Sequence, residues 1–400
     1  MTKRILVVGG GTGRAGVIEK ARALGADPVL VDDRSAAPPP SQECMLVEDI
    51  ANPALLVEAG QALGVDGMFA LEERAVDAVV YAAHELGLPG ISPEVAFRVR
   101  NKLALREALR AHGMPVPAFR GVHTVEEGET AALELGLPVV VRPADAGLGG
   151  GVQCVEYVED ISLAFVQARR LSSSGTVVVE TVVEGEAFNV DGQVFGGEYR
   201  LGGISGKERS EPPYRYDTGL YMPADIDAPL RYAIVDETLR ALQAVGFTDG
   251  TLRVEVVVCG DGPRIMEMAI PTIGGCVAVD LVAHAYGRDY LADSLRIALG
   301  ETPREQPRFE RGCALYWIPS RSGVVNQVLG AGQARAMPGV EEVELRVQPG
   351  DVLGHVVDCV TRDRIGRVLA TADTAEEAVC IAKAARDTVH VVTRPTYEQT

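Results

Sequence analysis

The stretch 139-VVVRPADAGLGGGV-152 places a cation at the end of an apolar run and a glycine-rich loop directly after it. The apolar run predicts a buried strand that ends at Arg142, and a second strand is expected after the loop. Successive glycine N–H groups can fold over phosphate oxygens, and a nearby cation offsets the negative charge of a phosphate. A plain hairpin would not need so long a loop. We therefore interpret the loop as a cover for a phosphate chain, with the glycines Gly147, Gly149, Gly150 and Gly151.

A pair of acids follows the next apolar run, in 177-VVVETVVEGEAF-188. Glu180 stands at the end of the predicted strand, and Glu186 comes six residues later. A chain that leaves a sheet exposes backbone N–H and C=O groups, here around Val183, which can pair with the edge of an adenine. A carboxylate beyond that point can accept hydrogen bonds from ribose hydroxyls. Taken alone, these acids can equally be solvated loop residues, but their position after the glycine loop favours a nucleotide site.

A third motif, 251-TLRVEVVVCGDGPRIMEMAIPTIGG-275, reads as two strands joined by the turn CGDG. Glu255 lies on the first strand and Glu267 on the second. If the strands pair as a hairpin, the two carboxylates converge on one face. Mg²⁺ prefers oxygen ligands of this kind, together with phosphates and waters. The simpler alternative is a pair of exposed strand acids.

The opening stretch 7-VVGGGTGRAG-16 contains the spacing G-x-G-x-x-G and follows an apolar run. In a dinucleotide-binding site this turn would hold the pyrophosphate, and Asp32 or Asp33 would hold the ribose. The same glycines serve any tight connection from a strand to a helix. Nothing else in the chain indicates oxidoreduction. A nicotinamide-dependent oxidoreductase is therefore the weakest of three functions that we consider, after the two nucleotide-binding functions described below.

Alternating apolar runs and helical patterns over residues 4–95 predict a doubly wound parallel sheet. A helix that ends at His112 follows, and residues 120–187 mix helices with short strands as in a small α+β lobe. The remainder is rich in strands and has one late helix. The predicted fold is therefore α/β and α+β, in three parts: 1–95, 96–187 and 188–400. The helices expected most clearly are 14–25, 52–63, 73–86, 124–136 and 159–171.

Composition excludes several classes of partner. The formal net charge of −18 disfavours nucleic acid and anionic membrane surfaces. The seven cysteines are scattered and include no C-x-x-C pair, so we expect neither a disulfide framework nor a zinc site. No apolar run is long enough to span a bilayer. A reducing cytoplasm is the expected compartment.

These motifs, in this order, resemble the ATP-grasp superfamily of carboxylate–amine ligases, and most closely its L-amino-acid ligase and carbamoyl-phosphate-synthase-like branch. The resemblance covers roughly residues 4–300. The segment 87–117 resembles the linker and first ATP-binding helix of the family, where Lys102 matches a lysine that contacts nucleotide phosphate. The segment 215–226 resembles a stretch that borders the substrate pocket. The opening glycine turn then belongs to a pre-ATP-grasp domain that binds no dinucleotide.

The resemblance implies an ATP-grasp fold of two α+β lobes and a reaction in two steps. A carboxylate attacks the γ-phosphorus of ATP to give an acyl phosphate and ADP, and an amine then displaces phosphate to form an amide. Small carboxylate and amine substrates are implied as partners, and a homodimer is common among relatives. An acid of the first domain, Glu72 or Glu73, is implied near the substrate amine, although either can equally be an acid that interacts with the dipole at a helix start. The resemblance implies that the nucleotide is bound by Lys102, Arg142, the four loop glycines, Glu180, Val183 and Glu186. It implies Glu255 and Glu267 as the Mg²⁺ ligands. The other implied substrate residues are Tyr216, Gly274 and Gly275.

Three positions depart from the family pattern. Arg142 stands where lysine is usual, and a guanidinium is bulkier and forked. The usual E-x-N-x-R of the last strand reads EMAIP, so Ala269 replaces a metal-ligating Asn and Pro271 replaces a catalytic Arg. A water can fill the vacant ligand position, since Mg²⁺ readily keeps waters. These losses favour the leading alternative, a non-catalytic relative that binds a nucleotide or metabolite.

Other cations can replace the missing arginine. Arg253 lies two residues before Glu255 and therefore on the same strand face. Lys207 and Arg209 in the run SGKERS are further candidates. Arg253 can equally be an ordinary surface residue of the strand. We name Arg253 and Lys207 as the candidate catalytic cations.

Overall fold

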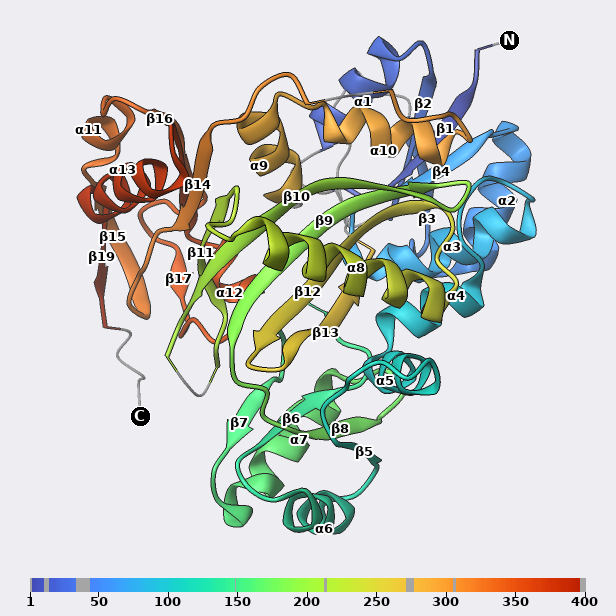
Figure 1. Cartoon of the computed structure of the whole chain (residues 1–400). Coiled ribbons are helices and arrows are strands. Elements are labelled where there is room, and N and C mark those ends of the chain that lie inside the picture. Colours follow the sequence, from blue (N-terminus) through green and yellow to red (C-terminus); the bar gives the residue numbers. More distant parts are fainter. Residues whose placement is uncertain are drawn as a thin grey trace.

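The computed structural model describes residues 2–10, 14–33, 44–147, 149–211, 214–270, 277–304 and 307–395. Within these residues the chain forms a parallel N-terminal sheet, a small antiparallel sheet, a large antiparallel sheet and a short C-terminal sheet. Figure 1 shows the small sheet and its helices projecting from the rest of the molecule at the bottom of the view. The predicted α/β and α+β fold class is confirmed.

The N-terminal sheet is parallel throughout, with strand order β3-β2-β1-β4. Helix α1 covers one face, while α2 and α3 cover the other, so both faces are buried, as parallel sheets require. Asn52 caps α2 by accepting a bond from the Ala54 N–H, and Gly64 ends that helix in the left-handed conformation. The elements are β1 (Arg4–Val8), α1 (Arg14–Ala23), β2 (Asp27–Asp33), β3 (Cys44–Val47), α2 (Pro53–Leu63), β4 (Gly67–Ala70), a 3₁₀ turn (Glu73–Ala75) and α3 (Val76–Glu85).

Two helices lead from this domain to the small lobe. The sequence analysis predicts a helix from about Arg100 to His112, and the structure has it as α5 (Lys102–Ala111). The preceding helix, α4 (Pro93–Arg100), was not predicted, and Asn101 separates the two. Asn101 adopts an extended conformation, and its side chain accepts a bond from the Ala104 N–H at 3.1 Å, so it starts a new helix. Lys102 is therefore the first residue of α5.

The small lobe is an antiparallel sheet with two helices on one face. Its strand order is β5-β8-β6-β7. Apolar side chains of α6 and α7 pack on the sheet and form the core of the lobe. The elements are β5 (Phe119–Val122), α6 (Val125–Leu135), β6 (Val139–Pro143), β7 (Gln153–Val155), a 3₁₀ turn (Val158–Asp160), α7 (Ile161–Leu171) and β8 (Val177–Thr181).

The large sheet has eight antiparallel strands in the order β13-β12-β9-β10-β11-β14-β18-β16. Helix α8 lies across one face of β9 and β12 (Figure 1), and α9 and α10 lie on the other side. The last three strands of the sheet come from the C-terminal region, which therefore completes the large sheet. The elements are β9 (Glu186–Phe195), β10 (Glu198–Arg209), β11 (Asp217–Met222), α8 (Ala228–Val245), β12 (Gly250–Cys259), β13 (Gly262–Ala269), α9 (Val277–Tyr286), α10 (Tyr290–Ala298), β14 (Gly312–Trp317), β16 (Val340–Leu345) and β18 (Gly366–Ala372).

The C-terminal region also forms a sheet of its own in the order β17-β15-β19. Helix α13 packs beside it and against β14 and β18. The elements are β15 (Gly323–Leu329), α11 (Ala331–Arg335), β17 (Val352–Leu353), α12 (Cys359–Asp363), α13 (Ala375–Thr388) and β19 (His390–Arg394).

Helix α8 is absent from the helices that the sequence analysis predicts. Its signals are present, because Asp227 accepts a bond from the Leu230 N–H at 2.9 Å, Pro229 stands in the first turn and Gly246 ends the helix with a φ of 77°. Strand-like runs lie on both sides of this segment in the sequence, and for this reason the region was interpreted as mainly β structure. Caps and a breaker residue were the better guide here.

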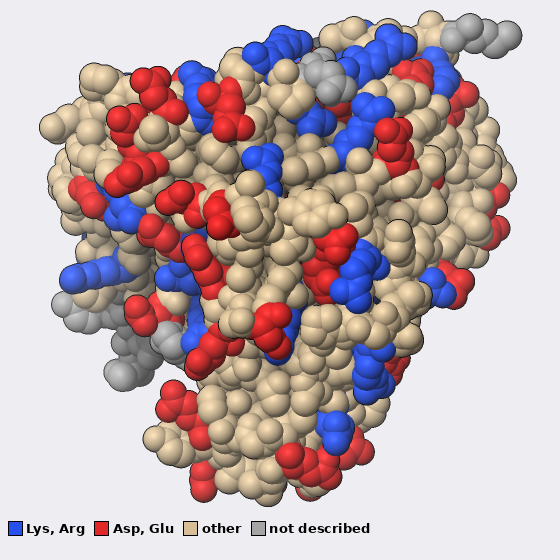
Figure 2. Space-filling model, in the orientation of Figure 1, with Lys and Arg blue, Asp and Glu red and all other residues tan. Residues whose placement is uncertain are grey.

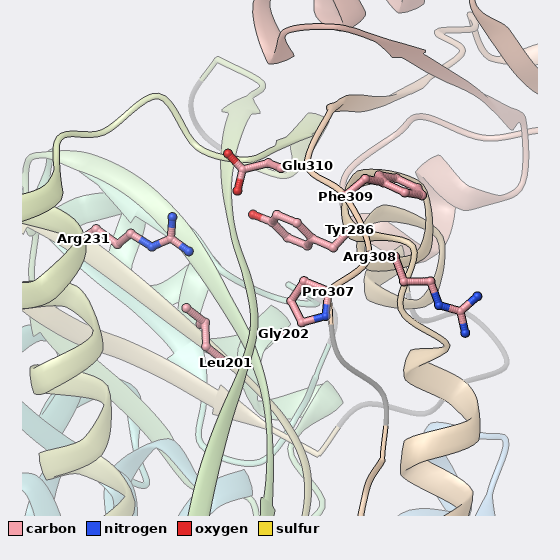
Figure 3. A pocket seen from close by; sticks show the side chains of 8 residues that line it. All are labelled: Leu201, Gly202, Arg231, Tyr286, Pro307, Arg308, Phe309 and Glu310. Atoms are coloured by element: carbon pink, nitrogen blue, oxygen red, sulfur yellow. The ribbon is translucent and has the colours of Figure 1, made fainter.

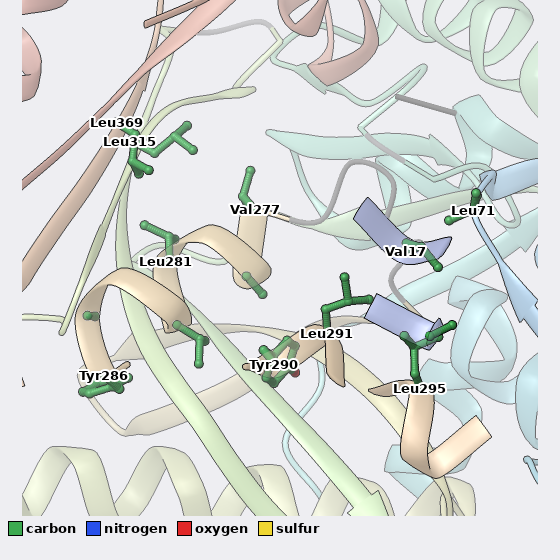
Figure 4. Close-up of a cluster of buried hydrophobic side chains, with 14 of the residues drawn as sticks. Val17, Leu71, Val277, Leu281, Tyr286, Tyr290, Leu291, Leu295, Leu315 and Leu369 are labelled. Atoms are coloured by element: carbon green, nitrogen blue, oxygen red, sulfur yellow. The ribbon is translucent and has the colours of Figure 1, made fainter. Parts of the chain in front are cut away.

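One apolar core joins the N-terminal sheet to the large sheet. It contains Val17 and Leu71 from the N-terminal domain, Leu281 of α9, Leu295 of α10 and Leu315 of β14 (Figure 4). Because these side chains share one core, the two parts are held in a fixed arrangement. The site between the lobes is built on this base.

The charged surface is mixed. Figure 2 shows acidic and basic side chains interspersed over one face, without a continuous basic patch in that view. No helix in the described part of the chain is long and apolar enough to cross a membrane.

We predict that Tyr290→Phe destabilises the protein. Tyr290 is fully buried, and its hydroxyl donates to the Gly192 carbonyl at 2.8 Å. Losing this bond should cost about 1–3 kcal/mol and lower the urea midpoint of unfolding. Tyr232→Phe on the exposed side of α8, where the residue is 74% exposed, is the matched control and should leave the midpoint unchanged. An unchanged midpoint for Tyr290→Phe would show that this bond contributes nothing.

Candidate active site

Lys102 lies where the small lobe meets the large sheet. It is only 4% exposed, and its Nζ donates to the Ala146 carbonyl at 2.7 Å, inside the glycine loop. The same Nζ lies 3.7 Å from Glu267 Oε1 on β13. Burial lowers the pKa of Lys102, and the charge of Glu267 partly offsets this effect. The predicted phosphate lysine therefore contacts both the loop and a predicted metal ligand.

A buried charge cluster, formed by Arg106, Glu180 and Arg142, lies beside Lys102. Arg106 Nε lies 3.0 Å from Glu180 Oε2, and an Arg142 terminal nitrogen lies 2.7 Å from Glu180 Oε1. Both arginines also reach β13, since the carbonyl of Met266 accepts from Arg106 at 2.9 Å and from Arg142 at 3.5 Å. The cluster therefore ties α5, β6 and β8 to the edge strand of the large sheet.

Glu180 is a structural acid in this arrangement. It is 1% exposed, so burial by itself would raise the pKa of its carboxyl, but Arg106 and Arg142 hold that pKa below its ordinary value. Removing one partner from such a cluster would leave an uncompensated buried charge. Both oxygens bind arginines, which argues against a solvated loop acid, whereas Glu186 is exposed.

The predicted hairpin is present, and its two acids face each other. Glu255 of β12 is the direct cross-strand partner of Glu267 of β13. A register shift follows directly after Glu255, which is a bulge. Arg142 lies 3.9 Å from Glu267 Oε2, so Glu267 faces two cations of the small-lobe side. We call Glu255 and Glu267 the acid pair.

Cations of β10 surround the other member of the acid pair. Lys207 Nζ lies 2.6 Å from Glu255 Oε2, and Arg209 lies 2.5 Å from Glu255 Oε1. Burial alone would raise the pKa of Glu255, but these two cations hold it well below its ordinary value. Asp217 lies 3.6 Å from each of the two cations. The amide oxygen of Asn189 accepts from Lys207 at 3.2 Å.

Arg253 occupies the next row of the same face. Its cross-strand partner on β13 is Ala269, the position at which the resemblance implies a lost ligand. Its guanidinium makes two bonds to Asp191, at 2.8 and 3.0 Å, and Asp191 is fully buried. The arginine is therefore held in one orientation beside the acid pair and is not an ordinary surface residue.

The glycine loop has a conformation that needs glycine. Gly149 and Gly151 have φ values of 73° and 71°, which other residues rarely adopt. A Cβ on Gly147 would lie 3.2 Å from Glu73 Oε1 of the N-terminal domain. Asp145 fixes the start of the loop, because its carboxylate accepts from the Ser174 N–H at 2.7 Å.

The two acids of the N-terminal domain have different roles. Glu72 accepts from the Gly10 N–H at 2.8 Å and binds Arg74 at 2.9 Å, so both of its oxygens have partners. The Gly10 N–H therefore already has an anionic partner, which argues against a pyrophosphate at this N–H. Gly11 and Gly13 of the motif lie outside the described residues. Glu73 instead lies beside the glycine loop and pairs with Arg100 at 2.7 Å.

The remaining predicted residues lie around the edges of the site or outside the described chain. Val183 lies between β8 and β9, outside both strands, so its backbone is not part of a ladder. Tyr216 precedes β11, and its N–H donates to the Ser210 hydroxyl at 3.2 Å. Gly274, Gly275 and Pro271 lie outside the described residues.

Several residues of the site escaped the sequence analysis. Arg106 lies four residues after Lys102, on the same helix face, and this spacing was an available signal. Asp191 and Asn189 lie two residues apart on β9 and share a face with the acid pair through strand pairing. Only the register places them there, so the sequence carried no usable signal for them.

The donor set at the acid pair fits Mg²⁺. The structure places two carboxylates side by side, and no group of three or more His, Cys, Asp or Glu side chains with metal-binding geometry occurs in the described part of the chain. Mg²⁺ commonly takes one or two carboxylates and completes its shell with phosphate oxygens and waters. Two protein carboxylates, with the remaining ligand positions left to phosphate oxygens and waters, are the donor set expected for nucleotide-bound Mg²⁺.

Family models match two parts of the chain. A model of the ATP-grasp domain matches residues 135–280, and a model described as L-amino acid ligase C-terminal domain 2 matches residues 315–394. The first match contains the glycine loop, Glu180 and the acid pair. The second contains most of the C-terminal strands.

Relatives extend over most of the chain. An uncharacterized protein of Sinorhizobium fredii, y4rH, is 30% identical over 374 residues, covering 92% of this chain and 76% of that protein. The L-arginine-specific L-amino acid ligase of Bacillus subtilis is 24% identical, covering 77% of each chain. Human carnosine synthase 1 is 28% identical, but this chain spans 40% of its length.

The fold has a solved counterpart. The structure of an L-amino acid ligase from Bacillus licheniformis superposes with a TM-score of 0.84 at 22% identity, covering 98% of this chain and 99% of the other. The family models and the relatives confirm the predicted resemblance, and this structure confirms the fold. This chain belongs to the ATP-grasp family of ligases and carries the C-terminal domain of its L-amino acid ligase group.

Proposed function

We propose that this protein is an ATP-dependent ligase that activates a small carboxylate and joins it to an amine, with release of ADP and phosphate. One observation carries the proposal. The acid pair lies on the large sheet directly opposite Lys102 and Arg142, and Lys102 bonds to the glycine loop. Such an arrangement serves a polyphosphate, because cations and loop amides contact its oxygens while the carboxylates hold its metal.

ATP would lie between the lobes. Lys102 and Arg142 would neutralise phosphate oxygens, and the glycine loop would cover them. The backbone around Val183 would pair with adenine, and Glu186, exposed at the start of β9, would accept from the ribose. Glu255 and Glu267 would hold Mg²⁺, which supplies positive charge to the phosphates when bound. The cations now paired with these acids would exchange some of their contacts for phosphate oxygens.

The protein would act mainly by positioning. In the first step an oxygen of the carboxylate bonds to the γ-phosphorus, the bond from that phosphorus to the bridging oxygen breaks, and ADP leaves. The amine nitrogen then bonds to the acyl carbon, the bond from carbon to the phosphate oxygen breaks, phosphate leaves, and the nitrogen releases a proton to give the neutral amide. Such transfers need orientation and charge neutralisation more than covalent help from the protein. The covering loop would exclude water that hydrolyses the acyl phosphate.

Glu73 is the better candidate for contact with the substrate amine. Both oxygens of Glu72 have partners, whereas Glu73 lies beside Gly147 with its side chain 37% exposed. Arg253 is the better candidate for the missing arginine, since it shares a strand face with Glu255 and Asp191 fixes its orientation there. Lys207 is buried against Glu255 and would help to set the charge of the acid pair.

We further propose that the substrates are amino acids. The relatives named above include an L-arginine-specific L-amino acid ligase.

The cysteines Cys154, Cys259, Cys313, Cys359 and Cys380 form no disulfide, which suits a reducing cytoplasm. A homodimer remains an expectation taken from relatives.

A screen of amino acids, singly and in pairs, for release of ADP and phosphate tests the proposal. A ligase releases ADP only with suitable substrates present and yields an amide detectable by mass spectrometry. Tight ATP binding without substrate-dependent release, across the whole panel, would instead support a non-catalytic nucleotide-binding protein.

We predict that Glu267→Gln abolishes most turnover. The substitution removes one negative charge of the acid pair and weakens the binding of Mg²⁺. The rate of ADP release should therefore fall by about 100-fold or more. A higher Mg²⁺ concentration should restore part of the rate of ADP release. Asp261→Asn, at the tip of the same hairpin, changes an exposed acid and should keep wild-type turnover. Full activity in Glu267→Gln would refute the metal assignment.

We predict that the positive charge of Arg253 contributes to catalysis, in addition to any structural role of its side chain. Arg253→Met should lower kcat for amide formation by about tenfold or more, with little change in the KM for ATP. Asp191→Asn breaks the same ion pair but keeps the cation, so its kcat should fall much less. Equal losses of kcat in both variants would assign Arg253 a purely structural role.

A further inference from the structure

A second cavity, of about 340 Å³, opens beside β10 on the large sheet. It is bounded by Arg231 of α8, Leu201 and Gly202 of β10, Tyr286 at the end of α9, and the segment 307–310 (Figure 3). Lys207 of the active site lies six residues beyond Leu201 on β10, which corresponds to roughly 20 Å of strand. The cavity is therefore separate from the acid pair.

Backbone bonds hold the outer wall of this cavity in place. The Arg308 N–H donates to the Tyr286 carbonyl at 2.9 Å, and the Arg311 N–H donates to the Ala285 carbonyl at 3.0 Å. On the inner side, Arg288 donates to the Leu201 carbonyl at 2.7 Å. Both walls are fixed before any ligand arrives, as in most small-molecule sites.

Glycine allows Tyr286 to lie directly on the strand. A Cβ on Gly203 would come within 2.9 Å of the Tyr286 ring, and a Cβ on Gly202 would come within 2.9 Å of the Asp191 carbonyl oxygen. Larger residues at these positions would push the ring or the strand away. The position of the Tyr286 ring against the strand therefore depends on Gly203.

The Tyr286 hydroxyl has no partner among the described residues. The residue is 5% exposed, and its oxygen is buried. Burial raises the pKa of Tyr286 to about 12, so the hydroxyl is protonated and can donate. An unpaired buried hydroxyl is costly and usually marks a missing ligand or water.

Two opposite charges meet this hydroxyl. Figure 3 shows the guanidinium of Arg231 and the carboxylate of Glu310 directed toward the same space as the Tyr286 hydroxyl. Leu201 and Pro307 supply apolar surface beside them, whereas the Phe309 ring points away from this space (Figure 3). The cavity thus presents a cation, an anion, a donor and an apolar wall at close range.

We propose that this cavity binds a free α-amino acid as a zwitterion. The carboxylate would contact Arg231 and accept from the Tyr286 hydroxyl, the ammonium would contact Glu310, and the side chain would lie along Leu201 and Pro307. A dicarboxylate would be repelled by Glu310, and a diamine by Arg231. An α-amino acid carries both charges a few bonds apart, as this arrangement requires. The inference rests on the cavity alone and does not depend on the proposed ligase reaction.

The test uses calorimetric titration of the whole protein. A panel of the standard amino acids identifies the tightest ligand, which is then compared with its N-acetyl derivative and its carboxamide. Arg231→Met and Tyr286→Phe should each weaken binding, by about tenfold or more for Arg231→Met. Arg240→Met, on the same helix but outside the cavity, is the control and should bind as wild type does. Both derivatives should also bind at least about tenfold more weakly than the free amino acid.

The outcomes separate this cavity from the catalytic site. Substrate-dependent ADP release should be retained in Arg231→Met, since this residue lies outside the catalytic machinery. Wild-type affinity in Arg231→Met would place the bound amino acid elsewhere and overturn the proposal. Equal affinity for the N-acetyl derivative would overturn the zwitterion, and the absence of any Arg231-dependent ligand in the panel would overturn the site.

Discussion

The carboxylate of Glu180, buried between two arginines, determines how the lobes of this protein meet. Arg106 comes from α5 and Arg142 from β6, and both also reach the Met266 carbonyl on the large sheet. A buried cation or anion alone would be strongly unfavourable, so each member requires the others. Because Met266 precedes Glu267, the same contacts set the position of the acid pair.

This cluster also accounts for the arginine at position 142. A lysine there offers a single ammonium, whereas the guanidinium of Arg142 contacts Glu180, the Met266 carbonyl and Glu267 with its terminal nitrogens. The forked side chain can therefore support the lobe contact and still face a phosphate. We regard the departure from the family lysine as compatible with nucleotide binding.

Much of the fold and part of the site could be predicted from sequence, for physical reasons. The alternation of apolar strands and helices indicated the parallel sheet, and the CGDG turn indicated the hairpin that brings Glu255 opposite Glu267. Helix α4 was missed, since Pro93 was read as a breaker, whereas in the structure it stands in the first turn of the helix after the Ser92 cap. Asp191 was missed, and the pairing of Glu180 with Arg142 was not predicted, because both ion pairs depend on strand register and tertiary packing.

The central claim is that the two lobes grip a nucleoside triphosphate through a divalent ion held by the acid pair. The most direct measurement is calorimetric titration of the whole protein with a non-hydrolysable ATP analogue, in Mg²⁺ and again in excess EDTA. The account predicts binding in Mg²⁺ that becomes at least about tenfold weaker in EDTA. No binding of the analogue under either condition would contradict it.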